Sequence, residues 1–328
     1  MKSLLLGAVR AAIAVSLLVW LSRSGVLEFS ALLRLLTAWP LTLAALALLA
    51  ADMAVTAWRL CVLVKPMGFD LTLWSSLRLS LIGVFFSSFL PGGGGGDLVR
   101  IYYALHGNRG QRTELGTVML LDRAAGLVAL LLWPLLAAAW FRGLLATHAV
   151  LQSLLWGAAL FFATLVAGAM AGFSPMVVKH ALVRSLLRRM PLGAYLERAL
   201  ATVHAYRNHA GSLLAAVGIS LAAHTMSIGV MLLVARAMHP ASFDWSMSLL
   251  IPLGALANAL PVTPGGIGVG EAAMNSLFQI AGLSGGADIL LGWRLLMLCL
   301  GLSGLVFYLQ GSRRLVHAAP GQQGEATP

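Results

Sequence analysis

The sequence predicts an all-α polytopic membrane protein with about six full transmembrane helices and two inverted re-entrant helical hairpins. The first observation is composition: 59% of the 328 residues are hydrophobic, only 10% are charged, and the mean hydropathy is +0.89. The second is that apolar runs of about 18 residues or more recur along the chain. The third is that two shorter apolar runs end in clusters of proline and glycine. A soluble fold would leave too much of this apolar surface in water.

Six segments are long enough to cross about 30 Å of hydrocarbon at about 1.5 Å per residue. The first follows Lys2 and Arg10 and resembles a signal peptide, but no small-x-small cleavage site follows it, so we expect an uncleaved helix. The predicted spans are residues 4–22, 40–58, 116–140, 151–172, 211–235 and 289–310.

The net charge of +11 is explained by the loops between these spans. Lys and Arg collect on the cytoplasmic side of membrane proteins, so the basic connections 59–78, 100–112 and 173–210 and the tail are predicted to be cytoplasmic, as are both termini. Nucleic-acid binding is therefore not needed to explain the positive net charge, and we expect no nucleic-acid partner. Cys61 and Cys299 lie far apart without metal-ligand neighbours, so we expect packing residues and neither a metal site nor a cofactor.

Residues 77–90 and 247–261 are too short for full spans, and they run into "FLPGGGGGD" and "ALPVTPGGIGVGE". A full crossing by 77–90 would place the basic loop 100–112 outside. A hairpin avoids this, with 77–90 entering from the cytoplasm and 97–106 returning, and 247–282 dipping in from the opposite side. We expect one transmembrane domain over 1–312, with 174–210 as amphipathic surface helices or an ordinary cytoplasmic linker, and a short polar tail over 313–328.

The two interrupted runs resemble each other. Each reads small polar residue, any residue, Leu, Pro, glycines and a carboxylate, at 88–97 and at 258–271. Paired interruptions of this kind in two halves of a chain are typical of an inverted-repeat transporter whose substrate site lies near the midplane.

The glycines of "PGGGGGD" prevent a continuous helix, because each costs about 1 kcal/mol relative to alanine and proline costs about 3. Broken backbone at membrane depth needs other protein or a hydrated cavity around it. The free N–H groups of the next half-helix favour an anion such as a lipid phosphate. The alternative is a tight packing turn with Asp97 as an N-cap. A P-loop is excluded because no GK[ST] follows.

Several ionisable residues lie in or beside these apolar segments. Asp97 and Arg100 are three apart and share a helix face. Asp122 and Arg123 point about 100° apart, so we expect each to pair with a different neighbour, either as structural ion pairs or at a headgroup. Glu271 is predicted either to start a helix or to pair with Arg100, Arg123 or Arg294.

Two further ionisable residues stand inside apolar segments. Asp52 lies two turns before Arg59. His224 is predicted to be either a hydrogen-bonded packing residue or part of a proton relay.

Three blocks, "FFSSFLPGGGGGDLVRIYYAL", "LLDRAAGL" and "NALPVTPGGIGVGEAAMNSLF", resemble in order those of the flippase-like family that includes the transmembrane region of lysylphosphatidylglycerol synthases and related stand-alone inner-membrane proteins. The resemblance implies a lipid-handling domain without chemistry of its own. Only a short polar segment follows residue 312, so we expect no aminoacyl-transferring domain.

The resemblance and the residue patterns together predict a bacterial inner-membrane protein that moves an anionic or polyprenyl-phosphate-linked lipid between leaflets. The competing interpretations are a membrane-embedded lipid-modifying enzyme, for which no HExxH or GxSxG motif is present, and a non-transporting envelope assembly factor. The predicted site falls into three groups: headgroup contacts at Arg100, Arg123, Gly95, Gly96, Gly265 and Gly266; charge partners at Asp97, Asp122 and Glu271; and hinges at Pro91, Pro261 and Gly268.

Overall fold

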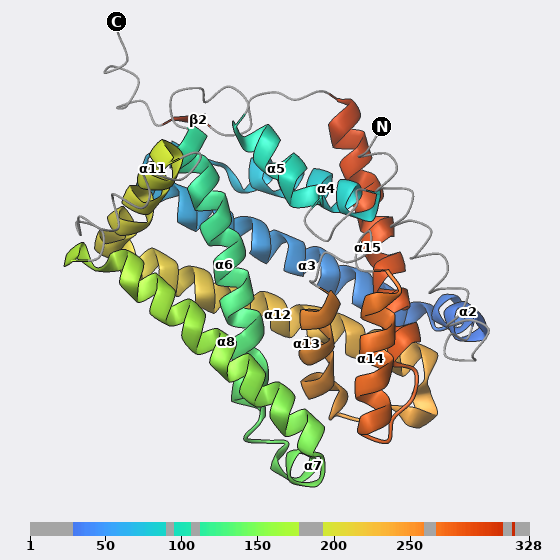
Figure 1. The fold of residues 1–328 in the computed structure, drawn as a ribbon. Coiled ribbons are helices and arrows are strands. Elements are labelled where there is room, and N and C mark those ends of the chain that lie inside the picture. Colours follow the sequence, from blue (N-terminus) through green and yellow to red (C-terminus); the bar gives the residue numbers. More distant parts are fainter. Residues whose placement is uncertain are drawn as a thin grey trace, which may run out of the picture.

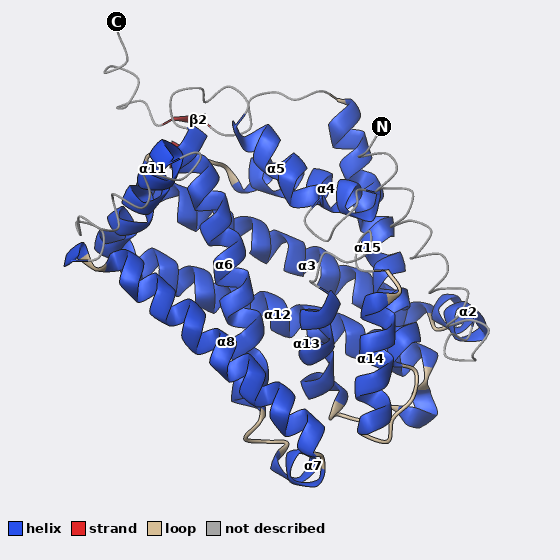
Figure 2. Cartoon of the chain, viewed as in Figure 1, coloured by secondary structure: helices blue, strands red, loops and turns tan. Residues whose placement is uncertain are grey.

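The structure is a computed structural model, and it describes residues 29–89, 95–105, 112–176, 193–258, 267–310 and 317–318. This part of the chain is almost entirely helical (Figures 1 and 2), apart from short loops and one two-residue strand pair. The α-helices are α2 (Phe29–Thr37), α3 (Trp39–Val64), α4 (Leu73–Phe89), α5 (Gly95–Leu105), α6 (Arg112–Ala137), α7 (Arg142–Thr147), α8 (Ala149–Phe173), α11 (Gly193–Ala205), α12 (Ala210–Met238), α13 (Met247–Asn258), α14 (Val269–Ile280) and α15 (Gly286–Leu309).

Five helices of the described chain are long and apolar enough to cross a membrane: Trp39–Met67, Arg112–Ala137, Ala149–Phe173, Glu197–Met238 and Gly286–Leu309. They correspond to the five predicted spans after the first, which confirms the all-α membrane class. The predicted span 4–22 lies outside the described residues. One boundary was wrong: the second span continues past residue 58 through α3 and the 3₁₀ turn η1 (Lys65–Met67). This places Arg59 inside a helix.

Helices α3 and α12 form the centre of the molecule and run antiparallel (Figure 1). Their side-chain contacts prove the direction, since Asp52 meets Ser227 whereas Arg59 meets Ser220. Tyr206, just before α12, is fully buried and donates its hydroxyl to the Leu63 carbonyl near the end of α3. The start of each helix therefore lies beside the end of the other.

The antiparallel pair fixes where the two short hairpins enter. Helix α4 follows the end of α3, and α5 leads back to the start of α6, so this hairpin opens at the end of the molecule where α3 finishes. Helix α13 follows the end of α12, and α14 leads to α15, so the second hairpin opens at the opposite end. Helices of 11 or 12 residues, α5, α13 and α14, reach only about 17–18 Å. The order and placement of these helices agree with the predicted pair of opposed hairpins, whose turns, residues 90–94 and 259–266, lie outside the described residues.

Turn chemistry marks the entry to the second hairpin. The 3₁₀ turn η4 (Pro240–Ser242) links α12 to the loop before α13. In that loop the backbone N–H of Ser246 donates to Asp244 Oδ1 over 2.7 Å. Hydrogen bonds from the side chain and the backbone of Ser246 lower the pKa of Asp244. The Asp244 carboxylate therefore accepts a backbone hydrogen bond just before the first turn of α13.

Glycines let α4 pack closely on its neighbours. A Cβ at Gly304 of α15 would lie 2.1 Å from the Leu81 carbonyl oxygen of α4, and one at Gly96 of α5 would lie 1.9 Å from the Gly83 carbonyl oxygen. Such backbone approach is available only to glycine. Aromatic contacts extend the α4–α15 interface, with Phe86 against Tyr308 and Arg78 over the Phe307 ring.

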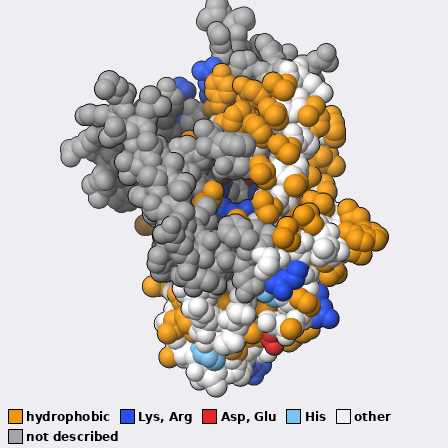
Figure 3. Space-filling view, turned by 90° about the vertical axis from the view of Figure 1, so that its right-hand side faces the viewer, with side chains coloured by type: hydrophobic (Ala, Val, Ile, Leu, Met, Phe, Trp, Pro, Cys, Tyr) orange, Lys and Arg blue, Asp and Glu red, His pale blue; other side chains and the backbone are white. Residues whose placement is uncertain are grey.

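The outer surface is apolar, as lipid contact requires. Only 6% of the most apolar window of α8 is buried, and the helix exposes large side chains along its length. Figure 3 shows apolar side chains over much of a different face. Trp39, Trp140 and Trp245 are exposed at the end of the molecule where α3 begins and α6 finishes, as in an interfacial aromatic belt.

The segment predicted as surface helices or a linker, 174–210, is described from residue 193 onward. There α11 packs against α6 and α8, and η3 (Tyr206–His209) joins it to α12. In the predicted tail, β2 (His317–Ala318) pairs antiparallel with β1 (Phe69–Asp70). The tail therefore returns to the end of the molecule where α3 finishes.

Candidate functional site

A band of polar side chains crosses the centre of the helical bundle between two apolar cores. One core holds the second halves of α12 and α6, the other the first halves of these helices and the end of α3. Between them Ser227 donates to Asp52 Oδ2 over 2.6 Å, and His224 Nε2 lies 2.9 Å from the Gly126 carbonyl oxygen. The hydrogen-bonded packing role predicted for His224 agrees with this contact.

Asp122 is the centre of a buried ion cluster. Its Oδ1 accepts from Arg59 Nε over 2.7 Å, and its Oδ2 lies 3.4 Å from Arg100 Nη1. Arg59 also donates through Nη1 to Ser220 Oγ over 2.9 Å. Asp122 is about 15 Å along α6 from its start, so the cluster lies near mid-depth of a bilayer of about 30 Å. One carboxylate thus holds one arginine from α3 and one from α5.

Arg100 is the least satisfied member of the cluster. The residue is buried, and its Nε and Nη2 have no hydrogen-bond partner among the described residues. Its one ion-pair contact is the 3.4 Å approach to Asp122, whose other oxygen is already taken by Arg59. Buried donors of this kind are costly unless something accepts from them. Arg100 therefore has donors ready for an additional acceptor.

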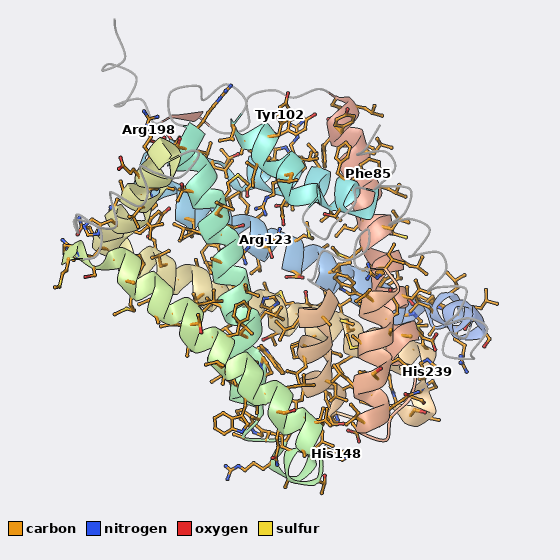
Figure 4. All side chains as sticks on the ribbon, in the orientation of Figure 1. Phe85, Tyr102, Arg123, His148, Arg198 and His239 are labelled. Atoms are coloured by element: carbon orange, nitrogen blue, oxygen red, sulfur yellow. The ribbon has the colours of Figure 1, made fainter. Side chains whose placement is uncertain are left out.

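Asp97 and Arg123 form a second ion pair, which joins α5 to α6. Their side chains are 42% and 49% exposed, in contrast to the buried Asp122 next along the chain. The prediction that Asp122 and Arg123 take different partners is confirmed. Asp97 lies inside α5 and is not its N-cap, so that part of the packing-turn alternative is wrong, whereas the turn itself, residues 90–94, lies outside the described residues. Figure 4 shows Arg123 partway along α6, toward the centre of the molecule.

The cluster carries more positive than negative groups. In the part of the chain that the structure describes, three arginines, Arg59, Arg100 and Arg123, share direct ion pairs with two carboxylates, Asp97 and Asp122, while Asp52 acts on Arg59 from farther away. On the face drawn in Figure 3, basic side chains are visible in a recess that has apolar side chains along its right-hand side. An excess guanidinium in a low-dielectric site favours an anion of fixed geometry, such as a phosphate.

Glu271 holds the start of the second hairpin's return helix. Its Oε2 accepts the backbone N–H of Gly268 over 2.7 Å, and its Oε1 lies 2.6 Å from Arg294 Nε of α15. Gly268 has a φ of 83°, which favours glycine. Glu271 is fully buried. Both predictions for it are therefore correct at once: it caps a helix start, and its ion partner is Arg294.

The two hairpins carry equivalent ion pairs. Helices α3 to α6 and helices α12 to α15 follow the same order of long, short, short and long elements, and they run in opposite directions. Asp97 is the third residue of α5 and Glu271 is the third residue of α14. Each carboxylate pairs with an arginine of the next long helix, Arg123 or Arg294. This equivalence supports the predicted inverted repeat.

Some predicted site residues are not placed by the structure. Pro91, Pro261, Gly265 and Gly266 lie outside the described residues, whereas Gly95 is seen as the first residue of α5. Sequence reasoning missed Ser220 and the role of Arg59, since the span that contains Arg59 was predicted to end before it. A charged residue inside "TAWRLCVLV" was the available signal.

Sequence reasoning also missed the pair of His239 Nε2 and Asp288 Oδ2, which are 3.0 Å apart. In Figure 4, His239 lies far from Arg123, near the end of the bundle where α12 finishes. This pair is therefore separate from the central cluster. In the part of the chain that the structure describes, no group of three or more His, Cys, Asp or Glu side chains could hold a metal ion.

The comparisons with known proteins give one match. The family model described as the lysylphosphatidylglycerol synthase TM region matches residues 7–304. Neither the curated proteins nor the solved structures contain a match to the chain. The matched range includes both hairpins and every ion pair of the central cluster.

Proposed function

Because the chain belongs to the family of the lysylphosphatidylglycerol synthase TM region, we propose that it moves a lipid with an anionic or polyprenyl-phosphate headgroup between the leaflets of a bacterial inner membrane. The observation that carries the proposal is the buried Arg100, whose Nε and Nη2 have no partner among the described residues and whose Nη1 lies 3.4 Å from Asp122 Oδ2. A phosphate supplies the acceptors that this guanidinium lacks.

The charged groups take different roles in this proposal. A headgroup contacts the half-exposed Asp97–Arg123 pair and the more buried Arg100 beside Asp122. Asp122 keeps Arg59 and Arg100 in position while the phosphate passes. The first turn of α5, at Gly95 and Gly96, adds backbone N–H groups and a favourable helix dipole. The lipid is relocated and not converted, so no catalytic residue is assigned.

Charge distribution supports one orientation. Lys65, Arg112, Arg198 and Arg207 all lie at the end of the molecule where α3 finishes and the tail strand β2 pairs. Because basic loops stay on the cytoplasmic side, this end faces the cytoplasm together with the C-terminal tail. The first hairpin then opens toward the cytoplasm, and the second opens toward the opposite side.

The test measures movement of a fluorescent phosphatidylglycerol between leaflets of proteoliposomes. We expect Arg100→Ala to reduce the rate at least tenfold, because Asp122 keeps Arg59 and the fold survives. Glu271→Gln retains an oxygen for the Gly268 N–H but loses the charge opposite Arg294, and should reduce the rate similarly. The matched control is Arg198→Ala on the exposed face of α11, where we expect no change.

Two outcomes would remove the proposal. Wild-type rates in both Arg100→Ala and Glu271→Gln would show that the central charges take no part in transport, as expected for an assembly factor. Chemical conversion of the lipid, detected by mass spectrometry of the vesicles, would support a lipid-modifying enzyme instead. A polyprenyl phosphate tested in the same vesicles distinguishes the two headgroup classes.

A further inference from the structure

The second hairpin borders a largely apolar cavity of about 190 Å³ between helices, which is partly open to the surroundings. Its walls come from α6, α12, α13, α14 and α15 and include Leu130, Ile228, Ala255, Met274, Leu290 and Trp293. Two polar side chains in the lining are engaged elsewhere: the Ser227 hydroxyl donates to Asp52, and His224 Nε2 contacts the Gly126 carbonyl. The buried Trp293 Nε1–H, also in the lining, has no hydrogen-bond partner among the described residues. The cavity is larger than one of about 150 Å³ that binds benzene.

The repeated arrangement of helices relates this cavity to the ion cluster. Arg100 follows Asp97 by three residues in α5, and Met274 follows Glu271 by three residues in α14. Asp122 directly precedes Arg123, and Trp293 directly precedes Arg294. Counted from the Asp97–Arg123 pair, which is half-exposed, and from the Glu271–Arg294 pair, which is mostly buried, Met274 and Trp293 stand at the sequence positions of Arg100 and Asp122.

The same two positions therefore carry opposite chemistry in the two halves. In the first half Arg100 and Asp122 approach within 3.4 Å as ions. In the second half Met274 and Trp293 line an apolar cavity. Trp293 lies about 11 Å along α15 from its start, so the cavity lies within the hydrocarbon depth and not at the interface.

We propose that this cavity binds a hydrocarbon chain of the lipid whose phosphate is held at Arg100. The inference rests on the proposed function and adds the chain-binding site to it. The first half of the protein then binds the phosphate of the lipid, and the second half binds its hydrocarbon chain. A hydrocarbon chain that moves from the bilayer into the cavity passes from one apolar environment to another, so it gains little hydrophobic free energy. The cavity therefore contributes van der Waals packing and holds the chain in position. Filling the cavity should therefore displace the chain without disturbing the ion cluster.

The experiment uses the full chain in nanodiscs with a phosphatidylglycerol that carries a diazirine in one acyl chain. After irradiation, we expect adducts on peptides of α13, α14 and α15. Ala255→Leu fills the cavity and should reduce these adducts at least fivefold, and the smaller Ala255→Val should reduce them partly. The matched control is Ala167→Leu on the exposed face of α8, which should label as the wild type does.

A polyprenyl phosphate with a diazirine in its chain identifies the source of the hydrocarbon, because adducts from only one probe assign the chain to that class. Adducts from neither probe on α13 to α15 would overturn the inference. Unchanged labelling in both Ala255 variants, with wild-type elution profiles, would overturn it as well. Pocket adducts without lipid movement would contradict the proposed function alone, whereas movement without pocket adducts would contradict only this inference.

Discussion

Asp122 of α6 connects three helices, because it pairs with one arginine of α3 and one of α5. Its burial determines how much the ion pairs contribute to the free energy of unfolding. The carboxylate is 2% exposed, and it contacts Arg59 of α3 and Arg100 of α5. Removing one member of a buried ion pair leaves an uncompensated charge, which costs much more than losing an exposed pair. By contrast, the Asp97–Arg123 pair is open to solvent or headgroups and contributes little to folding.

We expect Asp122→Asn to lower the free energy of unfolding by about 3–5 kcal/mol, because two guanidinium groups lose their counter-charge. The control Asp97→Asn breaks only the half-exposed pair and should cost at most about 1 kcal/mol. Unfolding by denaturant in mixed micelles measures both. Equal losses in the two variants would show that the central cluster does not stabilise the fold.

The contacts of some charged residues could be predicted from the sequence, and those of others could not. The divergence of Asp122 and Arg123 followed from helical geometry, because adjacent residues point about 100° apart. For Glu271, spacing left Arg100, Arg123 and Arg294 open, and only the packing of α14 on α15 selected Arg294. Ser220 is 161 residues from Arg59 along the chain, so no local pattern could pair them.

At the scale of elements, close backbone contact holds the first hairpin on α15. Gly304 and Gly301 allow α15 to approach α4, and aromatic side chains pack around that contact. Without a hydrophobic driving force between helices in lipid, such van der Waals packing decides which helices associate. Arg100 lies in α5, which packs on α4, so its position depends on the interface between α4 and α15.

Gly304→Ala should destabilise the protein by about 1–3 kcal/mol, because the new Cβ would overlap the Leu81 carbonyl and force α4 and α15 apart. Gly157→Ala in α8 is the control, since a Cβ there meets nothing within 4 Å. Helix propensity makes that change neutral or stabilising by up to about 1 kcal/mol. Thermal unfolding of the detergent-purified protein compares the two, and a similar loss in both would contradict the close contact.

At the scale of the whole molecule, Lys65, Arg112, Arg198 and Arg207 lie at one end, and the exposed Trp39, Trp140 and Trp245 lie at the other. Opposed hairpins enter from these two ends, so both can reach the central band without either crossing fully.

The topology can be tested with single cysteines after Cys61 and Cys299 are replaced by serine. Ala241→Cys lies between α12 and α13, and Asn208→Cys lies just before α12. In spheroplasts, a membrane-impermeant maleimide should label Ala241→Cys directly and Asn208→Cys only after permeabilisation. The reverse pattern would invert the orientation, and labelling of both sites from outside would contradict a single span between them.

The sequence by itself determined the membrane class and the spans after the first, because hydropathy acts locally. Only the tertiary structure decided which arginine meets which carboxylate, how deeply each pair is buried, and that Met274 and Trp293 line a cavity where the other half holds ions. These properties depend on contacts between helices far apart in the chain, which local patterns do not specify.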